Sequence, residues 1–144
     1  FEQAQELYRN RKNKKKLSYD TSDFDISFLR GLSLEEGVTT LTDFTASIIG
    51  EELSLSLKNL KDKVQDILLC GGGRKNPVLL KKIKKNILLD INLRLVDEYK
   101  VNGDFIESQA FAFLAVRSVL QLPISFPSTS GCKMPCTGGK LIKN

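Results

Sequence analysis

The sequence contains no histidine and only three cysteines among its 144 residues. Cys132 and Cys136 are separated by three residues, and Cys70 is the one other thiol. A structural zinc ion takes four cysteine or histidine ligands, which these residues cannot supply. We therefore expect no protein-bound metal and three reduced thiols in a cytoplasmic protein, with a disulfide as the less favoured alternative.

Long apolar runs are also missing. The most apolar window, 105–123, has an unbroken apolar run only from Ala110 to Val116, far short of the roughly 20 residues that span a bilayer. No signal peptide is visible, and the chain begins at Phe1 instead of methionine. We expect no membrane association, and we expect the chain to be a piece of a longer protein.

Acidic residues are fewer than basic ones, 17 against 22, and the basic residues are concentrated in two places. Six of the eight residues from Arg9 to Lys16 are arginine or lysine, and four lysines lie between Lys81 and Lys85. A tail that binds single-stranded nucleic acid usually adds aromatic residues for base stacking, and 9–16 has none. The sequence therefore favours a basic linker or interdomain loop over residues 1–17, without nucleic acid as a partner, followed by one lobe over residues 18–144.

The most informative stretch, 68–77, reads Leu-Leu-Cys-Gly-Gly-Gly-Arg-Lys-Asn-Pro. The apolar residues from Val64 to Cys70 predict a buried strand. Three glycines then interrupt it, and Asn76 and Pro77 are typical of a helix N-cap and a first helical position. Such a turn lets backbone amides approach an anion closely. The candidate nucleotide-binding residues are therefore Gly71, Gly72, Gly73 and Asn76.

A tight turn without a ligand is the alternative interpretation of this stretch. The residues match neither the G-x-G-x-x-G dinucleotide fingerprint nor the G-x-x-x-x-G-K-[ST] phosphate loop. The pattern alone leaves both interpretations open.

The surrounding pattern predicts an α/β fold. Ser33 and Glu36 form a capping box for a helix that we expect to run to about Leu57. A helix from Pro77 to about Leu88 and a strand from Ile91 to Val96 follow the first strand, so the two strands should pair in parallel. The apolar spacing also predicts which face of each helix points inward. The inward residues are Leu34, Val38, Leu41, Thr45 and Ile48 in the first helix, and Leu80, Ile83 and Ile87 in the second.

Glu107 is the candidate catalytic residue. The apolar segment from Asp104 to about Leu122 predicts a helix buried between layers, with Asp104 as its N-cap and Glu107 in its first turn. An acid at this position often only caps the helix and stabilises its dipole. A carboxylate that emerges from a buried helix near an anion-binding loop can also orient a substrate hydroxyl or a water. The segment that follows, 128–139, predicts turns.

Four blocks of the sequence carry a resemblance. They are 31–36 (Gly-Leu-Ser-Leu-Glu-Glu) with 41–46, then 69–77, then 103–118, and finally 126–131 with 137–139. In order and spacing, over about residues 17–142, they resemble the C-terminal part of the anhydro-N-acetylmuramic acid kinase family.

The resemblance implies one actin-like (ribonuclease H-like) ATPase lobe of a two-lobe sugar kinase, with a short, mostly parallel sheet and flanking helices. It implies ATP as cofactor, with Mg²⁺ held mainly through the nucleotide and the other lobe. The implied reaction uses ATP and water to convert 1,6-anhydro-N-acetylmuramic acid to N-acetylmuramic acid 6-phosphate in cell-wall recycling. Gly71, Gly72 and Gly73 would lie against the nucleotide, and Glu107 would contact the sugar and help to place the water. The implied partners are ATP, the sugar and an N-terminal lobe in cis or in trans, and a homodimer is compatible with the resemblance.

Some features depart from the family pattern. The family's Gly-Thr-Ser-x-Asp-Gly segment and its aspartate base belong to the other lobe and do not occur in this sequence. Leu17 and Thr21 stand where the family commonly has lysine and arginine. We therefore do not assign to this loop the sugar or phosphate contacts that the resemblance would imply. We therefore expect the chain alone to be inactive. The alternatives are a split or degenerate nucleotide-binding module of the same fold and, less favoured, a basic nucleic-acid-binding domain.

Overall fold

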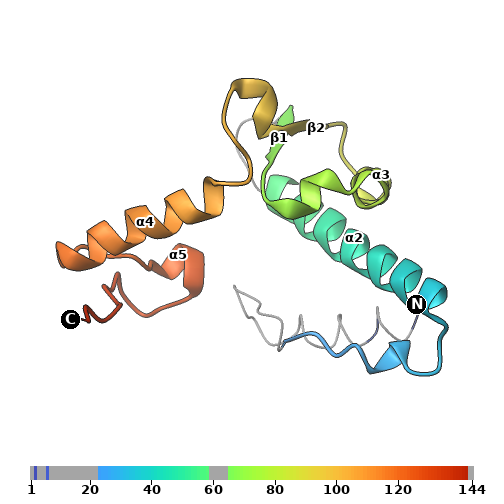
Figure 1. Cartoon of the computed structure of the whole chain (residues 1–144), viewed down its shortest axis with the longest axis horizontal. Coiled ribbons are helices and arrows are strands. Elements are labelled where there is room, and N and C mark those ends of the chain that lie inside the picture. The colour runs from blue at the N-terminus through green and yellow to red at the C-terminus, as the bar shows by residue number, and fades with distance from the viewer. Residues whose placement is uncertain (1, 3–5, 7–22, 59–64, 143–144) are drawn as a thin grey trace. The chain divides into compact units, whose positions relative to one another are not determined.

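The computed structural model describes residues 2, 6, 23–58 and 65–142, so the basic run at 9–16 and the positions of Leu17 and Thr21 lie outside the described residues. The described residues divide into two compact units: residues 2 and 26–106 belong to the first, and residues 6, 23–25 and 107–142 belong to the second. The first unit holds η2 (Ser27–Leu29), α2 (Leu34–Lys58), β1 (Asp66–Leu69), η3 (Gly72–Lys75), α3 (Pro77–Asn86), β2 (Asn92–Leu95) and η4 (Val96–Tyr99) (Figure 1). The second holds α4 (Ile106–Val119), from its second residue onward, and α5 (Pro127–Ser130).

The two strands confirm the predicted α/β class. β1 and β2 pair in parallel, with Asp66 opposite Asn92 and Leu69 opposite Leu95, and α3 connects them. Both strands are shorter than their apolar runs. β1 stops because Gly71 turns the backbone into the left-handed region, at φ 77°, and β2 stops because a 3₁₀ turn begins at Val96.

The capping box of α2 is present as predicted. The Glu36 amide donates to Ser33 Oγ at 3.3 Å, and the Ser33 amide donates to Glu36 Oε2 at 3.0 Å. The predicted inward face of α2 is wrong, because Leu34 and Val38 are 83% and 56% exposed. The buried residues are Phe44, Ala46, Gly50 and Ser54.

The packing of α2 on α3 explains this difference. Ala46, Gly50 and Ser54 are spaced four residues apart, so they form one row along the helix. Their small size lets α3 approach closely, and a Cβ on Gly50 would lie only 2.6 Å from the Cβ of Asn86. A search for large apolar side chains cannot find such a face. The contact between α2 and α3 therefore lies along the second half of α2.

The inward face of α3 is confirmed. Ile83 and Ile87 are buried, and with Ala46 and Ile91 they form the core of the first unit. The helix ends at Asn86, two residues before the expected position, and Ile87 acts as its C-cap in an extended conformation. Lys82 is half-buried against Asp43 of α2, with which it forms an ion pair.

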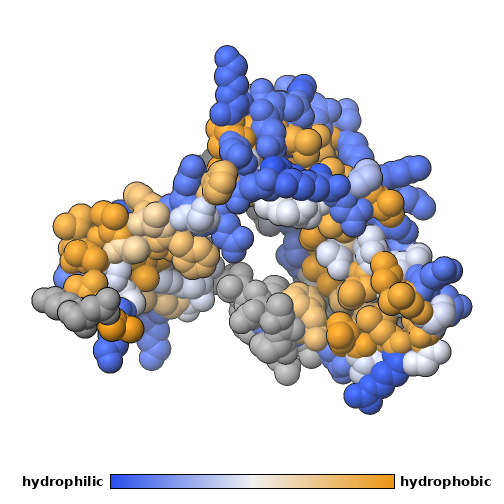
Figure 2. All heavy atoms as spheres, viewed as in Figure 1, coloured by the Kyte–Doolittle hydropathy of each residue, from blue (hydrophilic) through white to orange (hydrophobic). Residues whose placement is uncertain are grey.

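The prediction of a buried helix at 104–122 is wrong in two respects. α4 begins at Ile106, so Asp104 is not its N-cap, and it ends at Val119, with Gln121 in the left-handed region just after it. None of its residues is buried, and hydrophobic residues gather on its surface in Figure 2. Among the described residues, its unit contains no β-strand on which the helix could pack. The predicted turn region, 128–139, also contains the end of the single helical turn α5 and Cys136, which forms an isolated antiparallel bridge with Ser125.

Candidate nucleotide-binding turn

The glycine turn lies at the carboxyl ends of both parallel strands. Gly71 follows β1 almost directly, and its amide donates to the carbonyl of Gly103 at 3.0 Å. Gly103 itself belongs to the loop, 100–105, that follows β2 and η4. The edge where parallel strands end is where open α/β sheets bind their ligands. The turn is therefore in the place that a nucleotide site requires.

The backbone of the turn is open on its outer side. A Cβ added to Gly71 or to Gly72 would meet no heavy atom within 4 Å, and one on Gly73 would meet only Leu79 Cδ2 at 3.7 Å. Gly72 and Gly73 are exposed, and among the described residues no hydrogen bond uses their two amides. The turn thus presents two adjacent N–H donors to open space, which is an arrangement that suits an anion.

The start of α3 offers fewer free backbone amides to an anion than its sequence indicates. Asn76 is the N-cap as predicted, and its Oδ1 accepts the amides of Val78 and Leu79, both at 3.1 Å. Pro77 has no N–H, so the first helical amides are already used or absent. The donors that stay open to a ligand are therefore the amides of the turn and the Nδ2 group of Asn76, which has no hydrogen-bond partner in the described part of the chain.

Arg74 is the main residue of this site that the sequence pattern does not identify. Its side chain is only 5% exposed, although it lies within the turn. Nε and Nη2 form a bidentate pair with Asp97 at 2.7 and 3.0 Å, and Nη1 donates to Asp104 at 2.7 Å. The guanidinium holds the pKa of Asp97 at about 2 and that of Asp104 below its ordinary value, and both carboxylates raise the pKa of Arg74. The three charges are therefore permanent at neutral pH.

Glu107 lies in the second unit, whereas Gly71, Gly72, Gly73 and Asn76 are brought together in the first. It is the second residue of α4 and is exposed. Its carboxylate makes no hydrogen bond or ion pair with the described residues. Asp104, the expected N-cap, pairs instead with Arg74 and with Lys75, whose Nζ lies 2.7 Å from Asp104 Oδ2.

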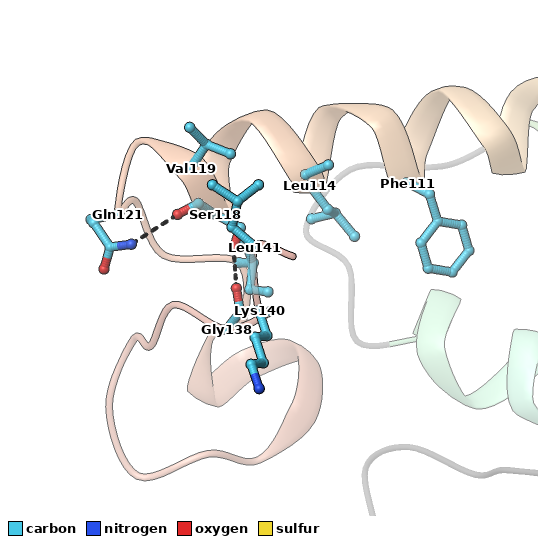
Figure 3. A pocket seen from close by; sticks show the side chains of 11 residues that line it. Phe111, Leu114, Ser118, Val119, Gln121, Gly138, Lys140 and Leu141 are labelled. Carbon is cyan, nitrogen blue, oxygen red and sulfur yellow. Dashed lines mark hydrogen bonds between the residues drawn. The ribbon is translucent and has the colours of Figure 1, made fainter. Parts of the chain in front are cut away.

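The second unit contains a groove of its own, of about 430 Å³, between α4 and the segment 138–141 (Figure 3). Phe111, Leu114 and Val119 give it apolar walls. The hydroxyl of Ser118 donates to the carbonyl of Gly138, which fastens the segment to the helix. The groove holds none of the residues that the sequence indicated for a site.

In the part of the chain that the structure describes, no three His, Cys, Asp or Glu side chains come together in a way that could hold a metal ion. None of the described helices combines the length and the apolar content that crossing a membrane demands. Cys70, Cys132 and Cys136 are free thiols.

Comparison with known proteins decides the family. The family profile described as anhydro-N-acetylmuramic acid kinase matches residues 16–144. The chain belongs to this family. Anhydro-N-acetylmuramic acid kinases from three bacteria illustrate the match. The chain is 51% identical over 142 residues to that of Pelagibacter ubique, 39% over 124 residues to that of Zymomonas mobilis, and 39% over 125 residues to that of Brucella anthropi.

These matches cover 99%, 86% and 87% of the chain but only 38%, 32% and 32% of the three kinases. The chain therefore spans about a third of the length of the curated relatives. The glycine turn, Arg74 and Glu107 all lie inside the region that matches the anhydro-N-acetylmuramic acid kinase profile.

Proposed function

We propose that this chain is the C-terminal, nucleotide- and sugar-binding lobe of a kinase. The kinase uses ATP and water to convert 1,6-anhydro-N-acetylmuramic acid to N-acetylmuramic acid 6-phosphate, in the cytoplasm, during cell-wall recycling. The observation that carries the proposal is the open glycine turn at the ends of two parallel strands, in a chain whose residues 16–144 match this kinase family.

ATP fits the residues of the turn. The exposed amides of Gly72 and Gly73 donate to phosphate oxygens, and the absence of side chains from Gly71 to Gly73 lets the nucleotide approach the backbone. Asn76, held by the cap through its Oδ1, offers Nδ2 as a further donor. Mg²⁺ accompanies the nucleotide and is held by ATP and by the other lobe, because the turn presents donors and no free carboxylate.

Glu107 is the proposed sugar contact, and it orients the sugar or the attacking water. Its carboxylate is exposed at the start of α4 and is not used by any described residue, so it is free to accept a hydrogen bond from a hydroxyl or a water. The base that activates the water is expected in the N-terminal lobe, in cis or in trans.

Two lobes are required because phosphoryl transfer depends on positioning and charge stabilisation from both sides of the nucleotide. The relatives' greater length supports this division, since the chain corresponds to about a third of each. The chain alone is then inactive. A homodimer of the full-length kinase is compatible with this arrangement.

The test is a turnover assay on the full-length protein with ATP, Mg²⁺ and 1,6-anhydro-N-acetylmuramic acid, in which mass spectrometry follows the sugar phosphate. We expect one molecule of N-acetylmuramic acid 6-phosphate for each molecule of ADP formed. ATP binding without any product would favour the second candidate, a degenerate nucleotide-binding module. Absence of both would overturn the proposal.

A further inference from the structure

Arg74 occupies an unusual position for a charged residue. Its side chain is 5% exposed, whereas Gly72 and Gly73 beside it are exposed. A buried charge is costly unless it is paired and hydrogen-bonded, and Arg74 is fully engaged in this way. Besides its bonds to Asp97 and Asp104, Nη1 donates to the carbonyl of Gly71 at 2.9 Å.

These bonds join the loops that follow the two strands. Gly71 begins the glycine turn after β1, and Asp97 belongs to η4 after β2. Asp97 also accepts the amide of Gly103 at 3.3 Å through Oδ1, the oxygen that accepts from Nη2 of Arg74. The carbonyl of Gly103 in turn accepts the amide of Gly71 at 3.0 Å. The guanidinium is therefore the centre of a closed ring of contacts.

Gly103 shows how tightly this ring is packed. A Cβ at this position would lie 2.4 Å from Nε and 2.7 Å from Cζ of Arg74. Real Cβ atoms essentially never make contacts below 3.0 Å, so a side chain at Gly103 would displace the guanidinium from its place. The glycine in the second loop is thus explained by the arginine in the first.

The number of hydrogen bonds that Arg74 makes distinguishes between two roles, positioning the turn and binding a phosphate. Arginine has five N–H donors. Four are used, two on Asp97, one on Asp104 and one on Gly71. One N–H on Nη2 remains, which is too few for the two parallel bonds by which arginine usually grips a phosphate.

We propose that Arg74 is a positioning residue: it holds the glycine turn against the loop after β2, so that the amides of Gly72 and Gly73 face the nucleotide, and it does not itself grip a phosphate. This inference rests on the proposed nucleotide site. Asp97 is the partner through which the positioning acts, because it binds Arg74 and Gly103 together.

The test compares Arg74→Lys, Asp97→Asn and the double variant in the full-length protein, with ATP binding measured by calorimetry. Lysine keeps the charge but cannot form the bidentate pair, and asparagine removes the charge of the partner. If Arg74 acts by positioning, each single change raises the Kd for ATP by about tenfold, the scale of a charge-assisted hydrogen bond. The double variant then binds about as weakly as either single one. If Arg74 grips phosphate, Asp97→Asn frees the guanidinium and leaves ATP binding equal or tighter, which would overturn the proposal.

Arg94→Lys is the matched control. Arg94 also pairs with two carboxylates, Asp66 and Glu98, but on the exposed face of the sheet, with 44% of its side chain exposed. We expect the Arg94→Lys protein to bind ATP with the same Kd as the parent.

Amide exchange without ligand supplies a readout that does not depend on the proposed function. Arg74→Lys and Asp97→Asn should both speed exchange at the amides of Gly71 and Gly103 and leave α2 and α3 as protected as in the parent. Unchanged exchange at both amides would refute the positioning role. If the parent protein binds no ATP, the proposed function fails, and the exchange data alone still decide whether Arg74 holds the turn.

Discussion

Replacing Gly50 by alanine should push α2 and α3 apart. The added Cβ would lie 2.6 Å from the Cβ of Asn86, 2.9 Å from its carbonyl carbon and 3.0 Å from its carbonyl oxygen. Two of these atoms are backbone, so no side-chain rotation relieves the contact. Ordinary contacts begin at 3.4 Å, so the helices must separate by about 0.8 Å at this point.

The expected cost follows from two opposing terms. Overpacking of a well-packed interface costs about 1–3 kcal/mol. Alanine in place of glycine inside a helix returns about 0.5–1 kcal/mol. The net destabilisation is then about 0.5–2 kcal/mol. The separation also stretches the bond from the Leu88 amide to the Ser54 hydroxyl, 3.1 Å, because Leu88 follows α3 and Ser54 belongs to α2.

Gly37→Ala is the matched control, because Gly37 lies in the same helix and a Cβ there meets no heavy atom within 4 Å. Gly37→Ala gains helix propensity without a clash. The difference in unfolding free energy between the two variants therefore measures the cost of the clash at Gly50, about 1–3 kcal/mol. Urea unfolding of the full-length protein measures both, and amide exchange in α3 localises the effect. Equal stabilities within about 0.5 kcal/mol would refute the close packing at Gly50.

Three further predictions concern the site and its charges. Glu107→Gln should lower kcat/KM of the two-lobe protein by about 10- to 150-fold, the value of a charge-assisted hydrogen bond made in the transition state, with an unchanged Tm; activity within twofold of the parent would leave Glu107 a structural role only. The 144-residue chain alone, purified free of host kinases, should show no phosphorylation of 1,6-anhydro-N-acetylmuramic acid, and measurable turnover would contradict the need for a second lobe. The pKa of Asp97 is lowered from 3.8 to about 2, so its ion pair adds stability that is complete above about pH 4 and is lost as the pH falls toward 2. Asp97→Asn should therefore flatten this part of the curve of unfolding free energy against pH, and an identical curve in the variant would show that the pair adds nothing.

Local chemistry made a large part of the fold predictable. The capping box of Ser33 and Glu36 and the start of α3 at Asn76 and Pro77 depend on neighbours within three residues, and both are present as expected. The parallel pairing of the strands follows from the strand–helix–strand order.

Long-range packing accounts for what the sequence could not predict. Arg74 is buried by Asp97 and Asp104, which are 23 and 30 residues away, so nothing beside it in the sequence indicates its burial. The same pairing removes Asp104 from the start of α4. The inner face of α2 is defined by the small residues Gly50 and Ser54, which a search for large apolar side chains ignores.

The candidate site, too, was predictable only in part. The glycine turn itself was predictable, because three glycines stand between an apolar strand and an Asn-Pro helix start, but the pattern fits a turn with or without a ligand. The cap at Asn76 was also predictable, and its Oδ1 accepts the amides of Val78 and Leu79, which leaves the anion site to the turn. The role of Glu107 stays a prediction, since an acid in the first turn of a helix is typical of a cap or of a substrate contact, and its carboxylate bonds to none of the described residues.

ATP binding by Gly72→Val in the full-length protein tests the central claim most directly. A Cβ on Gly72 meets nothing within 4 Å, so the substitution is tolerated by the fold and only fills the open side of the turn. Gly37→Val, equally uncrowded in α2, is the control. We predict that calorimetry finds the Kd of Gly72→Val raised by about 100-fold or more, with the circular dichroism spectrum of the parent, and the Kd of Gly37→Val unchanged. An unchanged affinity for ATP in Gly72→Val would contradict the assignment of the glycine turn to the nucleotide.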